Sequence, residues 1–143
     1  MSAPLMQFEI ITPERIVLRE EINGLTVPTE MGEITVLPGH IPLVSIVKPG
    51  VIIVHREAGD QGVLATSGGF LEVLEGKVVI LADTAEMASQ LDEERIKEAR
   101  AKAEALKQQA SNTDDVSFTE ASAMLEKELA RYKAVKHWRK LKS

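Results

Sequence analysis

The sequence predicts an N-terminal antiparallel β-sandwich followed by a C-terminal antiparallel hairpin of two α-helices. All nine glycines and all six prolines of the 143-residue chain lie before Lys77. Because glycine and proline mark turns and interrupt helices, this asymmetry divides the chain into a turn-rich first part and a helix-compatible second part. We place the domain boundary between residues 1–87 and residues 88–143.

The first part consists of short apolar runs separated by turn residues, which is typical of an antiparallel sandwich or barrel. The predicted strands are Phe8–Ile11, Ile16–Ile22, Leu25–Val27, Ile34–Leu37, Leu43–Val47, Val51–His55, Val63–Thr66, Phe70–Leu74 and Val78–Ala82. Proline cannot donate to a strand ladder, so we expect Pro28, Pro38, Pro42 and Pro49 at strand ends or edges. The pair Gly68–Gly69 precedes a strand and not a helix, which favours a tight turn or bulge over a phosphate-binding loop.

The second part reads as two amphipathic helices. Residues 92–110 are almost all strong helix formers, with an apolar stripe at spacings of three and four: Ile96, Ala99, Ala103, Leu106 and Ala110. A buried CH₂ group stabilises by about 0.8 kcal/mol, so we expect Ile96 and Leu106, more than the alanines, to dock this helix.

A polar break over Ser111–Asp115 separates the two helices, and Ser117–Glu120 has the pattern of a capping box that begins the second helix. The second stripe is Ala121, Leu125, Leu129, Tyr132 and Val135. A short polar loop between two periodic segments predicts antiparallel neighbours. Two helices of this length are marginal alone in water, so we expect the hairpin to be docked by only a few kcal/mol, which a partner can overcome.

Composition excludes several functions. The chain has no cysteine and only three histidines, and no Ser, His and Asp pattern suggests a nucleophile, so we expect neither a catalytic residue nor a metal site. Residues 1–87 carry 5 Lys or Arg against 12 Asp or Glu, a net charge of −7, which disfavours nucleic acid as a partner. No apolar run is long enough to span a bilayer, and residues 1–8 lack the features of a signal peptide.

Four segments in order carry a family resemblance: Val27–Leu43, Lys48–Val51, Ser67–Val73 and Leu81–Ala85. With these segments ahead of a helical tail, the chain resembles the epsilon subunit of bacterial and chloroplast F-type ATP synthases from Phe8 to about Trp138. The resemblance implies a non-catalytic rotor subunit that binds the gamma shaft and the c-ring and keeps proton flow coupled to ATP synthesis. It also implies a hairpin that packs on the sandwich or extends into the alpha/beta catalytic head, where it inhibits ATP hydrolysis.

The resemblance assigns roles to particular residues. Glu33, Pro38, Gly39 and His40 match the family's segment that faces the c-ring and the gamma shaft, although Thr35 stands where the family commonly has glycine. Leu91, Asp92 and Arg95 match a motif that binds regulatory ATP in several members, with Ile96 in place of alanine. The basic residues Arg131, Lys133, Lys136, Arg139 and Lys140 are expected to meet acidic segments of the catalytic head. No cofactor is required.

The resemblance implies a peripheral location on the cytoplasmic face of a bacterial inner membrane or the stromal face of a thylakoid, with membrane contact only through the complex. An alternative of another class is a free-standing sandwich that binds a partner and self-associates through its helical stripes. An enzyme is the weakest alternative.

Overall fold

The structure is a computed structural model that describes residues 4–110 and 115–142. Within these ranges the strands are β1 (Met6–Ile11), β2 (Ile16–Ile22), β3 (Gly24–Thr29), β4 (Gly32–Val36), β5 (Leu43–Val47), β6 (Gly50–His55), β7 (Gln61–Thr66), β8 (Gly69–Leu74), β9 (Lys77–Ala82) and β10 (Ala85–Met87). Short 3₁₀ turns lie at Glu57–Gly59 and Ala88–Gln90, and the helices are α1 (Glu93–Ala110) and α2 (Asp115–Lys142). The predicted sandwich and helical hairpin are confirmed; β10 was not predicted.

The strands follow the order β10-β7-β6-β3-β5-β8-β9-β1-β2, with β4 paired to β3. The sheet folds over where β3 meets β5, a junction that rests on the single register pair Thr29 and Val47. The two layers enclose a core without exposed surface at Phe8, Ile22, Leu25 and Leu71, among others. The pairing of β1 with β9 is parallel, whereas the other pairings between described strands are antiparallel.

Proline and glycine positions agree with the turn chemistry except at one site. Pro28 lies inside β3 and not at a strand end. It is tolerated because β3 changes neighbours there, from β6 up to Thr26 to β5 at Thr29, and the Pro28 carbonyl still accepts from the Lys48 amide at 2.9 Å. Gly69 has φ +152, and a Cβ there would lie 2.0 Å from the Leu81 carbonyl oxygen, so the close approach of β8 to β9 requires glycine at this position.

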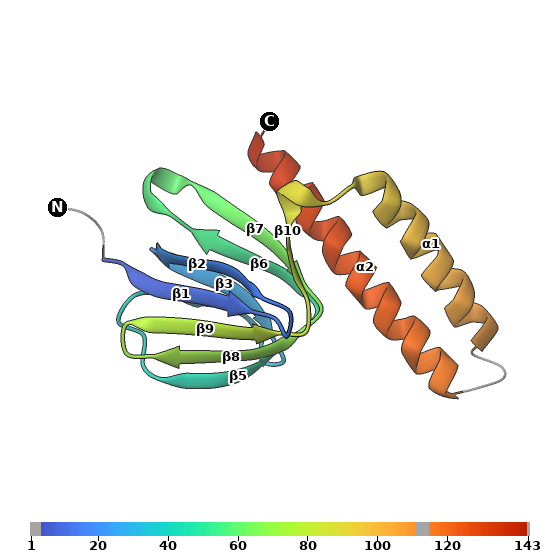
Figure 1. Cartoon of the computed structure of the whole chain (residues 1–143), viewed down its shortest axis with the longest axis horizontal. Helices are drawn as coiled ribbons and strands as arrows, with labels where there is room; N and C mark the ends of the chain where they lie inside the picture. The colour runs from blue at the N-terminus through green and yellow to red at the C-terminus, as the bar shows by residue number, and fades with distance from the viewer. Residues whose placement is uncertain (1–3, 111–114, 143) are drawn as a thin grey trace.

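The helices form an outer layer at one side of the sandwich (Figure 1). The helix α2 packs on β6 and β7, and α1 packs against α2. The docking contact is a second apolar cluster in which Ala134 of α2 meets Val63 and Ala65 of β7 and Ala88, with Trp138 at its margin. The residues Ala121 and Val135 of the predicted stripe are buried, and Tyr132 lies close to α1 at Arg100, so α2 is covered on two faces.

Two helix expectations were wrong in detail. Residues 111–114 of the predicted break lie outside the described residues, but α2 is already helical at Asp115, so Ser117 lies inside the helix and is not its N-cap. Leu106 is 39% exposed, whereas Ile96 and Ala103 are 4% and 0% exposed. The helices approach closely because small alanine side chains lie between them, and this geometry leaves the larger Leu106 at the margin.

Candidate functional site

An apolar row lies on the outward face of the strands β5, β8, β9, β1 and β2. Register pairs connect the row in the order Ile46, Phe70, Leu81, Ile11 and Ile16. The inward neighbours of these side chains, such as Leu71, Ile80 and Ile10, belong to the core. We call these five residues the outward row. Four of them are 44–55% exposed and Ile11 is half-buried.

Apolar side chains continue beside the outward row. Val44, which is 71% exposed, precedes Ile46 on the same face of β5, and Val79 is half-buried on β9. A contiguous apolar surface of this kind marks an interaction site, because isolated exposed apolar residues are normal but connected ones are not. The sequence held a signal for it: β9 is apolar from Val78 to Ala82 and β5 is apolar at four of its five positions, whereas an antiparallel strand with one solvated face alternates.

The predicted site around Glu33 and His40 is divided by the fold. Glu33 lies in β4 opposite Pro28, beside the Thr29–Gly32 turn. His40 lies in the loop after the other end of β4, so the two are separated by most of a strand, about 13 Å at 3.3 Å per residue. The structure therefore does not bring these two residues together.

The loop that contains His40 is a compact turn with apolar tips. The His40 amide donates to the Leu37 carbonyl at 3.1 Å across Pro38 and Gly39, and its ring Nδ1 donates to the Ile41 carbonyl at 2.6 Å. Leu37 and Ile41 are 57% and 75% exposed. These two side chains present a second apolar surface at an end of the sandwich.

Thr35 fits an ordinary strand. Among the described residues other than glycine, only Ala58 has a positive φ, so the position does not require glycine. The Thr35 hydroxyl lies 3.0 Å from that of Thr26, which in turn lies 2.8 Å from His55 Nε2. The departure from the family pattern at Thr35 therefore leaves the strand intact.

The predicted nucleotide residues lie at the start of α1. Asp92 is the N-cap, because its Oδ1 accepts from the amides of Glu94 and Arg95 at 3.0 and 3.4 Å. Arg95 lies 3.9 Å from Asp92 Oδ2 and is exposed. Both residues line a hollow of about 320 Å³ between α1 and α2, whose other lining residues are Glu86, Gln90, Leu91, Ile96, Ala99, Glu128 and Arg131.

Electrostatics in this hollow centre on Arg131. Its guanidinium pairs with Glu86 of β10 at 2.6 Å and with Glu128 of α2 at 2.6 Å. Burial opposes the charge of Arg131, but the two carboxylates outweigh it and raise its pKa above the ordinary value. The second oxygen of Glu128, Oε2, is buried without a hydrogen-bond partner among the described residues.

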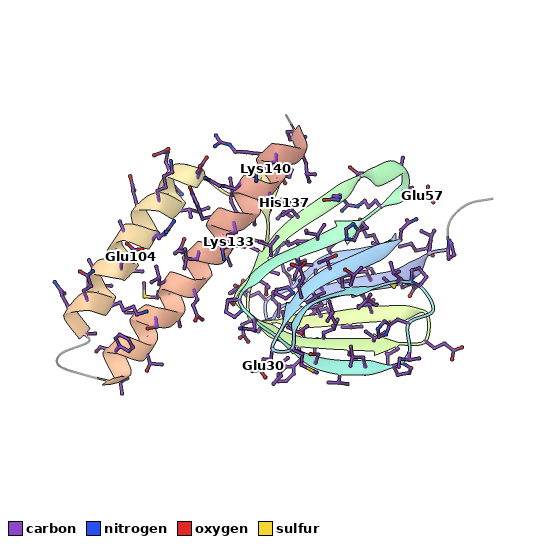
Figure 2. All side chains as sticks on the ribbon, turned by 180° about the vertical axis from the view of Figure 1, so that it is seen from behind. Glu30, Glu57, Glu104, Lys133, His137 and Lys140 are labelled. Atoms are coloured by element: carbon purple, nitrogen blue, oxygen red, sulfur yellow. The ribbon has the colours of Figure 1, made fainter. Side chains whose placement is uncertain are left out.

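The remaining predicted basic residues lie along α2 towards its C-terminus, where Figure 2 labels Lys133 and Lys140. Arg139 pairs with Glu93 of α1, and the Lys136 ammonium lies 5.0 Å from the Tyr132 ring. Lys133 is exposed beside a hollow that it shares with Lys48. Arg131 and Arg139 therefore hold the docked hairpin together, while Lys133 and Lys136 face solvent.

Two further observations concern the described residues alone. Within residues 4–110 and 115–142, no three His, Asp or Glu side chains are grouped closely enough to hold a metal ion. Over the same part of the chain, neither helix has a stretch sufficiently long and apolar to cross a bilayer.

The fold and surfaces define a β-sandwich docking domain that carries a helical arm. The model for the ATP synthase Delta/Epsilon chain β-sandwich domain matches residues 5–88. The ATP synthase epsilon chain of Chloroflexus aggregans is 40% identical over 126 residues, 88% of both chains. That of Desulforamulus reducens is 39% identical over 132 residues, 92% of this chain and 98% of its own. The chain thus belongs to the ATP synthase epsilon-chain family, whose members are non-catalytic subunits of that complex.

Solved structures agree with this assignment. A chain in the Euglena gracilis mitochondrial ATP synthase, solved as OSCP/F1/c-ring, matches with a TM-score of 0.80 and 26% identity over 94% of this chain and 84% of that one. A chain of the Tetrahymena thermophila mitochondrial ATP synthase central stalk and c-ring matches with a TM-score of 0.56 at 12% identity, covering 94% and 99%, which shows the fold alone.

Proposed function

We propose that the chain is the rotor subunit that connects the gamma shaft to the c-ring of a proton-translocating ATP synthase. The outward row carries this proposal, because it offers a broad exposed apolar face that a stable partner covers. The row binds the gamma shaft, while Glu33 and the loop with Pro38, Gly39 and His40 face the c-ring and the shaft. The chain then lies on the cytoplasmic face of a bacterial membrane, or the stromal face of a thylakoid.

The hairpin is the inhibitory part of this proposal. Three of the four buried residues in its docking cluster are alanines, Ala65, Ala88 and Ala134, and each alanine side chain contributes little burial. Release of α2 frees Arg131 from Glu86, and its basic residues Lys133, Lys136, Arg139 and Lys140 then meet acidic segments of the alpha/beta catalytic head. A weakly held arm with a basic end is suited to exchange one surface for another.

The test locks the hairpin. The chain has no native cysteine, so Ala65→Cys with Ala134→Cys places two thiols in one buried cluster, where oxidation or a short dithiol-bridging reagent joins them. ATP hydrolysis is measured with a catalytic head and gamma shaft depleted of epsilon. We expect the wild type to inhibit, the bridged variant to bind without inhibiting, and reductant to restore inhibition of the oxidised variant. Equal inhibition by the bridged variant, with the bridge verified on a non-reducing gel, contradicts the proposal.

A second function is favoured by the hollow at Asp92 and Arg95. We propose that ATP binds there as a regulatory ligand, with phosphates at Arg95 and with the unpartnered Glu128 Oε2 accepting from an amine or hydroxyl of the nucleotide. Asp92 positions Arg95 through their contact. Calorimetric titration with ATP checks this: Arg95→Gln abolishes the binding heat, whereas Lys102→Gln, an exposed cation outside the hollow, retains it. Unchanged binding by Arg95→Gln contradicts the site.

A further inference from the structure

The carboxylate of Glu72 is an isolated charge within the apolar surface around the outward row. Glu72 lies in β8 between Val44 of β5 and Val79 of β9, its register partners on the two sides. It follows Phe70 on the same outward face, since Leu71 between them is fully buried. Three apolar neighbours therefore surround one exposed carboxylate.

Glu72 has no ion pair or hydrogen bond with any described residue. A second acid at the same level of the sheet does have partners. That acid, Glu9, lies across β9 from Glu72, opposite Val79. Glu9 accepts from Arg19 at 3.0 Å and lies 3.5 Å from the Lys77 ammonium. Lys77 is diagonal to Glu72 across β8 and β9, but its ammonium is engaged by Glu9.

Covering this surface would remove water from Glu72. A carboxylate that is desolvated without a partner is costly, because the loss of hydration is not offset by protein contacts. A partner that covers Phe70, Val44 and Val79 must therefore supply a cation or several hydrogen-bond donors at Glu72. A partner without such a cation or such donors binds less well. The Glu72 charge therefore discriminates between partners as well as attracting a cationic one.

We propose that Glu72 is the specificity-determining residue of the outward face and that it pairs with a lysine or arginine of the central-stalk partner. This inference rests on the proposed docking of the outward row to the gamma shaft. The apolar row supplies the buried area, and Glu72 sets the orientation and the choice of partner. Its position at the margin of the row leaves the charge exposed for long-range attraction before contact.

The experiment measures binding of the full chain to a gamma-containing stalk, at low and at physiological salt, by association and dissociation rates. Four variants are compared with the wild type. Phe70→Ser tests the docking face, and Glu72→Gln and Glu72→Lys test the charge. Glu21→Gln is the matched control, because Glu21 is an exposed acid of β2 on the same outward face, opposite Gln7 and away from the row.

We expect Glu72→Gln to weaken binding about tenfold at low salt and to reduce its salt dependence, with a larger loss for Glu72→Lys. Glu21→Gln should bind within about twofold of the wild type, because it changes the same net charge outside the covered surface. Phe70→Ser should weaken binding at both salt concentrations.

The possible failures are distinguishable. If Phe70→Ser binds as tightly as the wild type, the outward row is not the docking face and the proposed function fails at this point. If Phe70→Ser loses binding while both Glu72 variants bind like the wild type at both salt concentrations, the docking face stands and the role of Glu72 is overturned. If Glu21→Gln loses as much as Glu72→Gln, only overall charge matters, which also overturns it. Phe70 and Glu72 are both exposed, so circular dichroism should show an unchanged fold.

Discussion

Arg131 of α2 donates through Nε to Glu86 Oε1 of β10 at 2.7 Å, and this ion pair ties the helical arm to the sandwich. The same guanidinium holds Glu128 on its own helix at 2.6 Å. One cation thus serves two carboxylates, one on each side of the domain junction. When the arm leaves the sandwich, Arg131 loses Glu86 but retains Glu128, so the charge of α2 stays partly balanced.

Removing Arg131 should weaken docking more than removing Glu86. Arg131→Met leaves the buried Glu128 without its cation, and we expect a cost of about 2 kcal/mol in docking. Glu86→Gln retains a hydrogen-bond acceptor and should cost about 1 kcal/mol. Trp138, the only tryptophan, lies at the docking cluster, so its fluorescence during urea titration measures both changes. Equal urea midpoints for the two variants would contradict the view that Arg131 serves both Glu86 and Glu128.

The docking contribution of Arg131 should persist into strongly alkaline solution. Burial lowers the pKa of Arg131, but the carboxylates of Glu86 and Glu128 outweigh burial and raise it above its ordinary value. A raised pKa gives a contribution that is complete below the unfolded value and is lost only as pH rises through the folded one. We therefore expect the difference in docking between wild type and Arg131→Met, followed by Trp138 fluorescence, to stay constant from about pH 8 to about pH 10. A decline within that range argues against the ion pair.

Enlarging Ala134 should release the hairpin without unfolding the sandwich. Ala134 has no exposed surface and contacts the β7 side of the docking cluster, so Ala134→Leu overpacks it at a cost of about 1–3 kcal/mol. Hydrogen exchange should show loss of protection in α2 and in β7 near Val63, with the core strands unchanged. Ala123→Leu on the exposed surface of α2 is the control and should leave exchange unaltered.

The two glycine turns of β8 should respond very differently to alanine. In Gly69→Ala the new Cβ meets the Leu81 carbonyl and the adjacent backbone, so we expect a loss of about 3 kcal/mol or more in the free energy of unfolding. Gly76 also has a positive φ, +71, but open space surrounds it, so Gly76→Ala should cost only about 1 kcal/mol. Chemical denaturation of both variants measures the difference. Similar losses in the free energy of unfolding would contradict the close approach of Gly69 to the Leu81 carbonyl.

The full chain should remain monomeric at micromolar concentration. The alternative of a self-associating module requires helical stripes that are open to a second copy. Ala121, Ala134 and Val135 are instead buried within the chain. Sedimentation velocity at two concentrations checks this, and a sedimentation coefficient that rises with concentration favours the alternative.

Local signals predicted most of the fold because turn residues and apolar runs act over short distances. Ile16–Ile22 and Leu43–Val47 are strands with the predicted bounds. Pro28 was misplaced because the change of neighbours along β3 depends on residues distant in sequence. The predictions for Ser117 as an N-cap and for Leu106 as a docking residue were wrong for a related reason. A capping pattern does not decide where a helix begins, and an apolar stripe does not reveal how closely two helices approach.

The candidate site was less accessible from sequence. Glu33 and His40 are close in the chain, yet β4 holds them apart. Arg131 was predicted as one of a cluster of basic residues. Its pairing with Glu86 joins residues 45 positions apart, which no local sequence pattern shows. The outward row was missed because its five members come from five strands, and only the register aligns them. The roles assigned to Asp92, Arg95 and the basic residues of α2 remain predictions.

Because α2 lies between the sandwich and α1, the two helices need not separate from their neighbours together. The main contacts of α1 are with α2, whereas α2 packs on β6 and β7. The contact between α1 and α2 can therefore open while α2 stays on the sandwich, with α1 still joined to β10 through residues 88–92. Separation of the whole hairpin from the sandwich, by contrast, requires loss of the contacts that α2 makes with β6 and β7.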